Sequence, residues 1–499
     1  MPCPPCHPPQ ATGAPLNGAE LLLGAHDAAA TAIECDGRRI GYGALRERVA
    51  RAGALWRARG VQPGSRVAVK LPDGIDWVIA WLGAIWAGGV AVGINPKIPA
   101  PEWQYILDEA GFDLIVAESD EGTPAPWCTR VIRVDDARRA VAAMAPMRAL
   151  PMPAEAPAFW VHSSGTSGKP KAVVHAQRSL GDIACISAER LGIEPGDRLF
   201  SSSRLFFCYP LVNVLLAGLR IGATLLLEPQ WPTAENVAAT VARTRPTVLF
   251  CVPALYRDML RRGIAPQLAA AGVRRFVSAG EALPATLREA WRAATARPMI
   301  DGYGASEVLC LVLTALDGDD GLRPSPGVQA RPLDARAADA GGPTRLLIRT
   351  STLALGYLDR PAAQADSFRD GAFCPADLFV RTAGGGWRFA GREDALVKVR
   401  GRWVDLTALG EQLGEGLEGL REGACACVHD ADGVEALAYF YAAEPHDAER
   451  LAEALRARVA RLSPYQRPAW LRRLDALPRT AAGKLLRRQL AAALDESAR

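Results

Sequence analysis

The string SSGTSGKPK at residues 163–171 determines how the rest of this sequence is interpreted. It lies between two apolar runs, FWV at 159–161 and AVVH at 172–175. Small residues leave backbone N–H groups accessible, hydroxyls add hydrogen-bond donors and lysines add positive charge, so the string predicts a loop that binds phosphate oxygens. It is not a Walker A loop, because its glycines are too closely spaced and Pro170 stands where a helix would have to begin. A Ser/Gly linker has a similar composition, but a linker is not expected to pass from one strand directly into another.

Outward from this loop, between about residues 40 and 390, short apolar runs alternate with helical stretches. The alternation predicts a layered α/β domain with largely parallel sheets. Strands are expected at residues 66–71, 114–117, 224–227, 248–252 and 275–278, and helices at 231–243 and 253–262.

The pattern changes after Gly391, where the charged residues 392–394 lead into about a hundred residues, enough for a small independent domain. We therefore expect a flexible leader at residues 1–17, an N-terminal domain at 18–391 and a small, mobile α+β lid domain at 392–499, with the hinge near Asp394. Within the lid, strands are expected at 424–429 and 435–442 and helices at 447–461 and 484–494.

Composition excludes several classes of protein. The chain has 499 residues, of which 49% are hydrophobic and 22% charged, as in soluble globular proteins. Its net charge of +4 does not indicate a nucleic-acid-binding protein, which would need a basic face or stripe. Residues 77–94 carry no charge, but Gly88 and Gly89 divide them into a buried helix and a buried strand, which argues against a membrane span. The leader lacks the features of a signal peptide, which predicts a cytoplasmic protein, and the 11 scattered cysteines predict reduced thiols.

Three further strings carry groups suited to nucleotide chemistry. DGYGASE at 301–307 ends in a carboxylate that would hold Mg²⁺. Asp377 and the string GRED at 391–394 follow, and PRTAAGK at 478–484 places Lys484 on a glycine-containing turn before a helix. Each string alone has an ordinary explanation, because D-G-x-G is a common turn and an exposed lysine usually serves solubility.

In this order, the four strings resemble the adenylate-forming superfamily of acyl-CoA synthetases and peptide-synthetase adenylation domains, over about residues 20–492. The likeness is greatest to benzoate- and anthranilate-type aryl-CoA ligases, since FFCYPLVN at 206–213, SAGEALP at 278–284 and KVRGRWV at 398–404 are similar to segments of those enzymes. The resemblance implies that the N-terminal domain binds ATP and an acid. It also implies Mg²⁺, and coenzyme A or a phosphopantetheinyl carrier protein as the acceptor.

The same resemblance implies a role for each candidate site residue. Lys484 is implied to be the catalytic lysine, acting with Thr166 and Glu307, which would hold Mg²⁺, while Asp394 would be the hinge of the lid. The implied ATP site comprises Ser163, Ser164, Gly165, Thr166, Ser167, Gly168 and Lys171 at the phosphates, Gly280, Glu281, Asp301, Gly302, Tyr303 and Gly304 around adenine, and Asp377 and Arg392 at the ribose. The implied acid pocket is formed by Phe206, Tyr209, Ala279, Tyr303 and Cys310.

Several positions depart from the family pattern. Adenylation is still expected, because the charged groups of the phosphate loop and of the ribose motif are retained. The departures near the acid pocket leave the identity of the acid open. They are Ala172, Pro375 and Ala376 near the nucleotide, Pro210, Val212 and Cys310 near the pocket, and a shortened segment at 323–345.

The sequence thus predicts an acid–thiol ligase that activates a carboxylic acid with ATP and transfers it to coenzyme A, releasing AMP. Tyr209 and Tyr303 supply flat walls and the pocket segments lack Lys and Arg, so a benzoate-sized acid is favoured over a dicarboxylate. One alternative is a stand-alone adenylation enzyme that loads an acyl or aryl carrier protein, and a second is a catalytically silent nucleotide-binding protein on the same fold. No nucleic-acid or membrane partner is expected, and a homodimer is left open.

Overall fold

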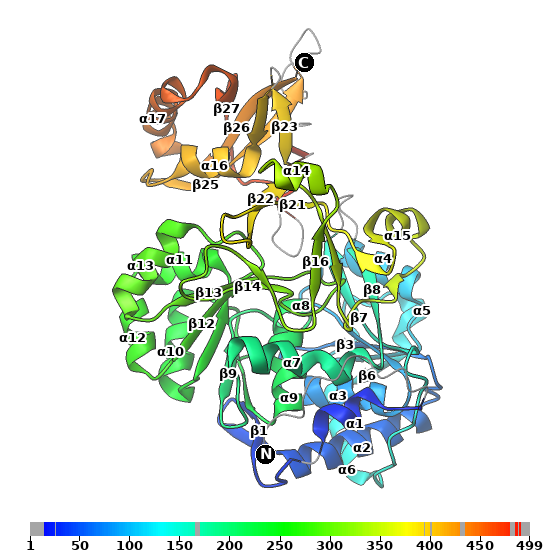
Figure 1. Cartoon of the computed structure of the whole chain (residues 1–499). Coiled ribbons are helices and arrows are strands. Elements are labelled where there is room, and N and C mark those ends of the chain that lie inside the picture. The colour runs from blue at the N-terminus through cyan, green and yellow to red at the C-terminus, as the bar shows by residue number, and fades with distance from the viewer. Residues whose placement is uncertain are drawn as a thin grey trace.

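The computed structural model describes residues 14–24, 26–164, 170–393, 395–399, 402–429, 435–479, 485–487 and 489–490. Within these ranges two large sheets and a smaller one form the body of the molecule, and separate small sheets belong to its C-terminal part (Figure 1). The mixed α/β class predicted from the alternation of apolar runs is therefore confirmed.

The first large sheet has nine strands in the order β15-β14-β13-β12-β11-β9-β10-β1-β2. Its strands from β13 to β1 run parallel to one another, and antiparallel strands complete both edges. The parallel strands are short, almost fully buried apolar runs, as expected where helices cover both faces. The strands are β1 (Thr31–Cys35), β2 (Arg38–Gly41), β9 (Arg198–Ser201), β10 (Thr224–Leu227), β11 (Val248–Cys251), β12 (Arg275–Ala279), β13 (Met299–Tyr303), β14 (Leu313–Ala315) and β15 (Arg323–Pro324).

The second large sheet has seven strands in the order β18-β8-β7-β4-β3-β5-β6. Its strands from β6 to β7 are parallel, whereas β8 is antiparallel to β7 and β18 is antiparallel to β8. The strands are β3 (Arg66–Lys70), β4 (Val90–Gly93), β5 (Leu114–Ala117), β6 (Val131–Arg133), β7 (Pro157–Ser164), β8 (Pro170–Ala176) and β18 (Gly356–Tyr357).

Helices between and outside the sheets supply the core. One apolar cluster unites strands of both large sheets with α1, α2, α3, α7 and α9, and a second packs α10 to α13 on the nine-stranded sheet (Figure 1). The bounds are α1 (Gly18–Leu23), α2 (Tyr42–Ala58), α3 (Ile75–Trp86), α4 (Ala100–Ala110), α5 (Ala125–Cys128), α6 (Val134–Ala143), α7 (Ser179–Leu191), α8 (Cys208–Pro210), a π-helical stretch (Leu211–Leu216), α9 (Ala217–Ile221), α10 (Ala234–Thr244), α11 (Pro253–Arg261), α12 (Ala265–Ala270) and α13 (Ala285–Thr295).

The uncharged stretch at residues 77–94 divides as expected. Every residue of α3 except Asp76 is buried, Gly88 turns the chain at φ +83°, and β4 follows. Among the described residues, no helix is long and apolar enough to cross a membrane.

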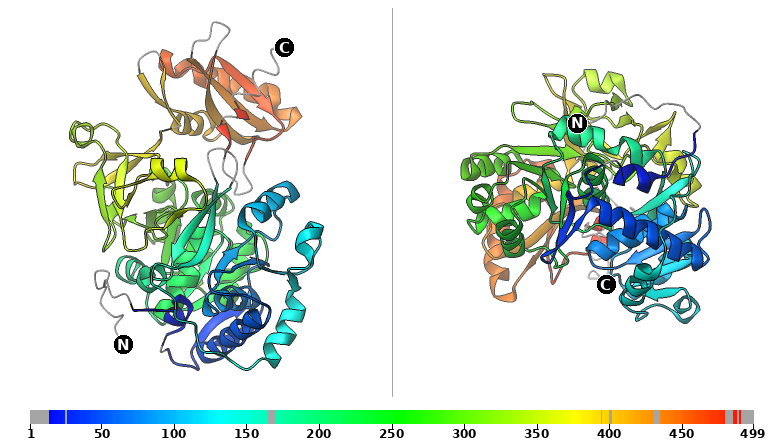
Figure 2. Two further views of the ribbon diagram at one scale, coloured as in Figure 1. Left: turned by 90° about the vertical axis from the view of Figure 1, so that its right-hand side faces the viewer. Right: turned by 90° about the horizontal axis from the view of Figure 1, so that it is seen from below.

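A smaller C-terminal part follows the large one and stands apart from it in Figure 2. Its described residues form two apolar clusters of their own, which contain only residues from Val399 onward. This arrangement confirms a large N-terminal and a small C-terminal part. The boundary at residue 391 remains a prediction, and the predicted hinge Asp394 lies outside the described residues. The elements are β23 (Leu396–Val399), β24 (Arg402–Asp405), α16 (Leu406–Gly414), β25 (Leu420–His429), β26 (Glu435–Ala443), α17 (Ala448–Arg461) and β27 (Trp470–Leu474).

Two minor sheets are formed by the last stretch of chain before the C-terminal part, residues 329–392. A four-stranded sheet has the order β16-β17-β20-β19, and a two-stranded hairpin joins β21 to β22. Their bounds, with those of two short helices, are β16 (Gln329–Pro332), α14 (Ala335–Asp339), β17 (Leu346–Arg349), α15 (Pro361–Ser367), β19 (Phe368–Arg369), β20 (Ala372–Phe373), β21 (Asp377–Arg381) and β22 (Trp387–Arg392).

Candidate active site

The predicted phosphate loop connects two strands that pair antiparallel. Strands β7 and β8 pair from Pro157 to Ser164, and Ser163 lies opposite Lys171 at the end next to the loop. This placement supports a strand-to-strand loop over a linker, because both flanks belong to one sheet. Four of the residues assigned to the phosphates, Gly165, Thr166, Ser167 and Gly168, lie outside the described residues, as does the side chain of Ser164.

Ser163 has an unsatisfied hydroxyl beside this loop. Its Oγ is buried and has no hydrogen-bond partner within the described part of the chain. A buried polar atom without a partner costs free energy unless a ligand or water satisfies it. The hydroxyl therefore fits a ligand oxygen at the loop.

The segments predicted to surround adenine follow the carboxyl ends of two neighbouring parallel strands. Ala279 at the end of β12 lies opposite Gly302 in β13, so Gly280 and Gly304 emerge on the same edge of the sheet. In α/β sheets this edge is where ligands bind. Gly304 has a packing reason as well, because a Cβ there would lie 2.6 Å from the carbonyl oxygen of Cys310.

Two carboxylates in these segments have protein partners. Glu281 is exposed, and its Oε2 accepts a hydrogen bond from the backbone N of Ala254 at 3.3 Å, in the first turn of α11. Asp301 pairs with Arg288 at 3.3 Å, and burial raises the pKa of Asp301 to about 6. The carboxylate of Asp301 is thus directed to α13, which leaves the backbone of residues 301–304 as the part of this string that would border adenine.

The structure brings the predicted ribose residues together. Asp377 begins β21 and lies opposite Arg392 at the end of β22, with Oδ1 of Asp377 3.2 Å from Nη1 of Arg392. The hydroxyl of Tyr303 donates to Oδ2 of Asp377 at 2.6 Å, and its ring packs edge-on against Phe379 at 5.0 Å. Tyr303, predicted for both adenine and the acid pocket, therefore also connects β13 to the ribose motif.

Glu307 meets a residue that the sequence did not single out. Its Oε1 accepts a 2.6 Å hydrogen bond from the hydroxyl of Tyr357 in β18, and the ammonium of Lys171 lies 4.5 Å from the centroid of the same ring. Glu307, the predicted metal ligand, and Lys171, the lysine after the phosphate loop, thus both contact Tyr357. The described residues contain no group of three His, Cys, Asp or Glu side chains placed to hold a metal ion.

The predicted catalytic lysine, Lys484, lies outside the described residues, but both ends of its turn are described. Arg479 and Leu485 form an antiparallel bridge across the turn. Arg479 also pairs with Glu422 of β25 at 2.7 Å, and Glu422 accepts the backbone N–H of Leu477 at 3.0 Å. The described residues on either side of Lys484 therefore pair with each other, and Arg479 is bound to the sheet of the C-terminal part.

Two contacts link segments of the predicted acid pocket to one another. The hydroxyl of Tyr209 donates to the carbonyl of Val277 at 3.0 Å, two residues before Ala279. Cys208 Sγ lies 3.8 Å from the carbonyl oxygen of Leu309, next to Cys310. Phe206 packs on Phe207 with ring centroids 4.3 Å apart.

Cys310 is a buried thiol in this region. Its Sγ lies 3.9 Å from the carbonyl oxygen of Ile183, and burial raises the pKa of its thiol to about 12. Val212 is also fully buried and belongs to the main apolar cluster, within the π-helical stretch that follows Pro210. The three departures near the predicted pocket, Pro210, Val212 and Cys310, are thus buried residues without charge.

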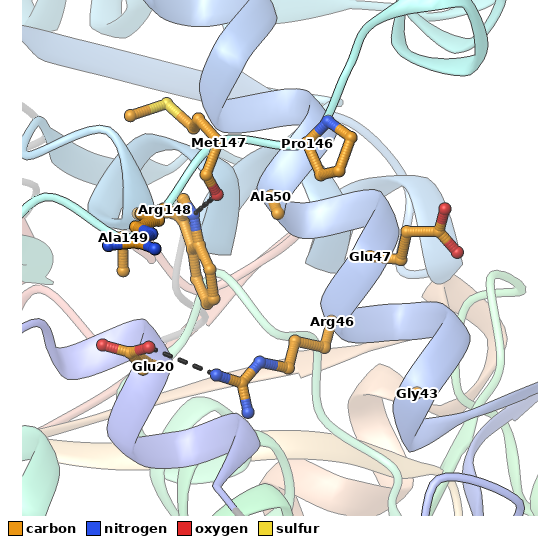
Figure 3. Close-up of a pocket in the computed structure, with 10 residues that line it drawn as sticks. Glu20, Gly43, Arg46, Glu47, Ala50, Pro146, Met147, Arg148 and Ala149 are labelled. Atoms are coloured by element: carbon orange, nitrogen blue, oxygen red, sulfur yellow. Dashed lines mark hydrogen bonds and ion pairs between the residues drawn. The ribbon is translucent and has the colours of Figure 1, made fainter.

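A hollow of about 560 Å³ opens elsewhere on the surface, between α1, α2 and residues 146–149 (Figure 3). Arg46 pairs with Glu20 across it at 3.2 Å, and the carbonyl of Met147 accepts a 3.0 Å hydrogen bond from Nε1 of Trp86. None of the predicted site residues lines this hollow.

Comparison with known proteins identifies the family of the chain. Residues 24–358 match the model of the family described as AMP-binding enzyme, and the chain belongs to that family. Among its relatives, the 3-hydroxybenzoate/4-hydroxybenzoate–CoA ligase of Thauera aromatica is 34% identical over 488 residues, covering 92% of this chain and 93% of that protein. The anthranilate–CoA ligase of Pseudomonas aeruginosa is 33% identical over 464 residues, covering 87% and 88%.

Solved structures give the same result in three dimensions. The anthranilate CoA ligase AuaEII in complex with anthranoyl-AMP superposes with a TM-score of 0.86 at 26% identity, covering 97% of this chain and 98% of that one. A benzoate CoA ligase from Burkholderia xenovorans LB400 gives a TM-score of 0.82 at 29% identity, covering 95% and 100%. The predicted resemblance to aryl-CoA ligases is confirmed.

Proposed function

We propose that this protein activates an aromatic carboxylic acid with ATP and transfers the acyl group to coenzyme A, releasing pyrophosphate and AMP. The observation that carries the proposal is identity above 30% to aryl-CoA ligases over nine-tenths of both chains, including the small C-terminal part. The convergence of Asp377, Arg392 and Tyr303 at the carboxyl edge of the nine-stranded sheet supports it.

In the first half-reaction, a carboxylate oxygen of the acid attacks the α-phosphorus of ATP, and the bond to the oxygen that bridges to the β-phosphate breaks. Negative charge gathers on the departing pyrophosphate, so cations and donors fixed in advance supply most of the catalysis. We assign Lys171, Ser163 and residues 165–168 to the β- and γ-phosphates, and Asp377 with Arg392 to the ribose hydroxyls. Lys484 would bridge the acid carboxylate and an α-phosphate oxygen.

Mg²⁺ fits the groups available at this site. Glu307 and Thr166 offer carboxylate and hydroxyl oxygens, the ligands that Mg²⁺ prefers, and Mg²⁺ usually binds through one or two carboxylates together with substrate phosphates. When bound, it would neutralise charge on the phosphate oxygens.

In the second half-reaction, the thiol sulfur of coenzyme A attacks the carbonyl carbon of the acyl-adenylate, the bond from that carbon to the AMP oxygen breaks, and the thiol proton is lost. Lys484 has no task at this stage. We therefore assign residues 392–499 to a lid that turns about Asp394 between the two half-reactions.

The acid we propose is benzoate-sized, with hydroxy or amino substituents among the candidates, as in the names of the relatives. Tyr209 and Phe206 supply aromatic surface, and the packed residues Cys310 and Val212 add no charge that would pair with a second carboxylate.

The decisive experiment is exchange of labelled pyrophosphate into ATP over a panel of acids. Exchange that depends on an aryl acid is expected. Absence of acid-dependent exchange would overturn adenylation and leave the fold with a nucleotide-binding role. Incubating the protein separately with coenzyme A and with a pantetheinylated carrier protein, then weighing the products, identifies the acceptor. Aryl transfer to the carrier alone would replace coenzyme A in the proposal.

A further inference from the structure

Residues 352–357, which include β18, contact both the backbone and the carboxylate of Glu307. The backbone N–H of Ala354 donates to the carbonyl of Glu307 at 2.8 Å, and Thr352 Oγ1 donates to the carbonyl of Val308 at 2.7 Å. The hydroxyl of Tyr357 then donates to Glu307 Oε1 at 2.6 Å. Glu307 is buried, so these contacts fix the direction of a carboxylate that has little access to solvent.

The same phenol contacts a cation through its ring. β18 joins the edge of the sheet antiparallel to β8, with Tyr357 opposite Val173. Lys171 lies two residues from Val173, hence on the same face of the sheet and diagonal to Tyr357. Its ammonium lies 4.5 Å from the ring centroid, within the range of a cation–π interaction.

Tyr357 is held firmly in this position. Gly356 before it has φ +141°, and a Cβ there would lie 2.3 Å from Oε1 of Gln364, which accepts the backbone N–H of Tyr357 at 3.0 Å. The ring of Phe368 packs edge-on at 5.4 Å.

We propose that Tyr357 is a positioning residue that keeps Lys171 and Glu307 apart, so that the lysine remains available to a phosphate oxygen of ATP and the carboxylate to Mg²⁺. Opposite charges this close to one ring would otherwise pair directly. Among the described residues no ion pair joins Lys171 to Glu307, and each contacts Tyr357 instead. The proposal rests on the proposed function of this site, because it assigns both charges to Mg²⁺·ATP.

The test is calorimetric binding of ATP to the full chain without acid, in Mg²⁺ and in EDTA. Tyr357→Phe keeps the ring and loses the hydroxyl. It should reduce the Mg²⁺-dependent gain in ATP affinity about tenfold, the effect of losing a hydrogen bond to a charged group, and leave affinity in EDTA unchanged. Tyr357→Leu also removes the ring, so the lysine can pair with Glu307 and affinity in EDTA should fall about tenfold as well. Tyr42→Phe is the matched control, because it removes a 2.7 Å phenol hydrogen bond, to the carbonyl of Ala223, in a distant part of the core.

The double variant Tyr357→Leu/Glu307→Gln separates positioning from general damage. With the carboxylate neutralised, Lys171 has no partner to pair with, so affinity in EDTA should return to within about twofold of the unaltered chain. No recovery, or an equal loss in EDTA and in Mg²⁺ for Tyr357→Phe, would overturn the proposal. Acid-dependent pyrophosphate exchange by the unaltered chain is measured separately, so a chain that binds ATP as described but activates no acid would contradict the proposed function alone.

Discussion

Asp377 uses both of its carboxylate oxygens within the protein, one toward Tyr303 and one toward Arg392. The family resemblance implied that Asp377 and Arg392 would both lie at the ribose, and the structure brings their side chains within 3.2 Å of each other. It could not predict the hydrogen bond from Tyr303, which depends on how the β21–β22 hairpin lies against β13. Tyr357 was missed for the same reason, since it meets Glu307 only through the pairing of β18 with a strand some 180 residues earlier.

At Lys484, we expect the two half-reactions to respond differently to loss of the side chain. Lys484→Ala should lower acid-dependent pyrophosphate exchange by at least about 10²–10³-fold, the effect of removing a preorganised charge donor. Conversion of a supplied acyl-adenylate to the thioester should remain near the original rate. Equal losses in both assays, with an unchanged circular dichroism spectrum, would contradict a lysine that acts in one half-reaction only.

At His175, we expect a contribution to stability that disappears in acid. The ring is fully buried, stacks on Phe159 at 5.0 Å and contacts the carbonyl of Ser306 at 2.8 Å. Burial lowers the pKa of His175 to about 3, whereas in the unfolded chain it is about 6.5. Between these values the unfolded chain binds more protons, so stability falls as the pH falls, by about 2 kcal/mol from pH 7.5 to pH 5.

His175→Asn should remove that share of the pH dependence, measured as the difference in urea unfolding free energy between pH 7.5 and pH 5. The exposed residue His446, 3.4 Å from Asp447, supplies the control, and His446→Asn should change the difference by less than about 1 kcal/mol, as for a surface ion pair. An undiminished acid loss in His175→Asn would show that other groups carry it.

Among the elements, those with a local signal were predicted well. Helix α10 begins after Thr233, whose side chain accepts from the backbone N of Asn236, and α11 begins with Pro253 at its first position. Strand β27 was missed, because its sequence WLRRL places two exposed arginines side by side and shows no alternation. The π-helical stretch at Leu211–Leu216 has no recognised sequence signal either. Of the expected helix at 484–494, residues 485–487, 489 and 490 are described, and residues 487, 489 and 490 are helical.

The predicted hinge lies in the connection between the two parts, and a proline there should slow one half-reaction more than the other. Asp394→Pro fixes φ near −65° and removes a backbone N–H, so it should retain most of one half-reaction and reduce the other by about tenfold or more. Single-turnover formation of the acyl-adenylate and of the thioester, measured separately, would reveal this. An unchanged overall rate would place the hinge at another residue.

For the molecule as a whole, we expect acid selection to follow the size of the ring. Values of kcat/KM for benzoate, anthranilate, hexanoate and palmitate should favour the two aryl acids, because the pocket segments offer aromatic surface and lie in packed protein around Cys310 and Tyr209. A preference for hexanoate or palmitate would contradict the aryl acid and leave adenylation intact.

The small C-terminal part has apolar clusters that contain no residue of the large part. Mutations that reshape the acid pocket therefore leave the folding of the part that carries Lys484 largely unaffected. Over generations, a lineage of such enzymes can change the acid it consumes by substitutions in the first four-fifths of its gene, while the last fifth is inherited with little alteration. New substrate preferences can then arise while the segment proposed to supply the catalytic lysine stays unchanged.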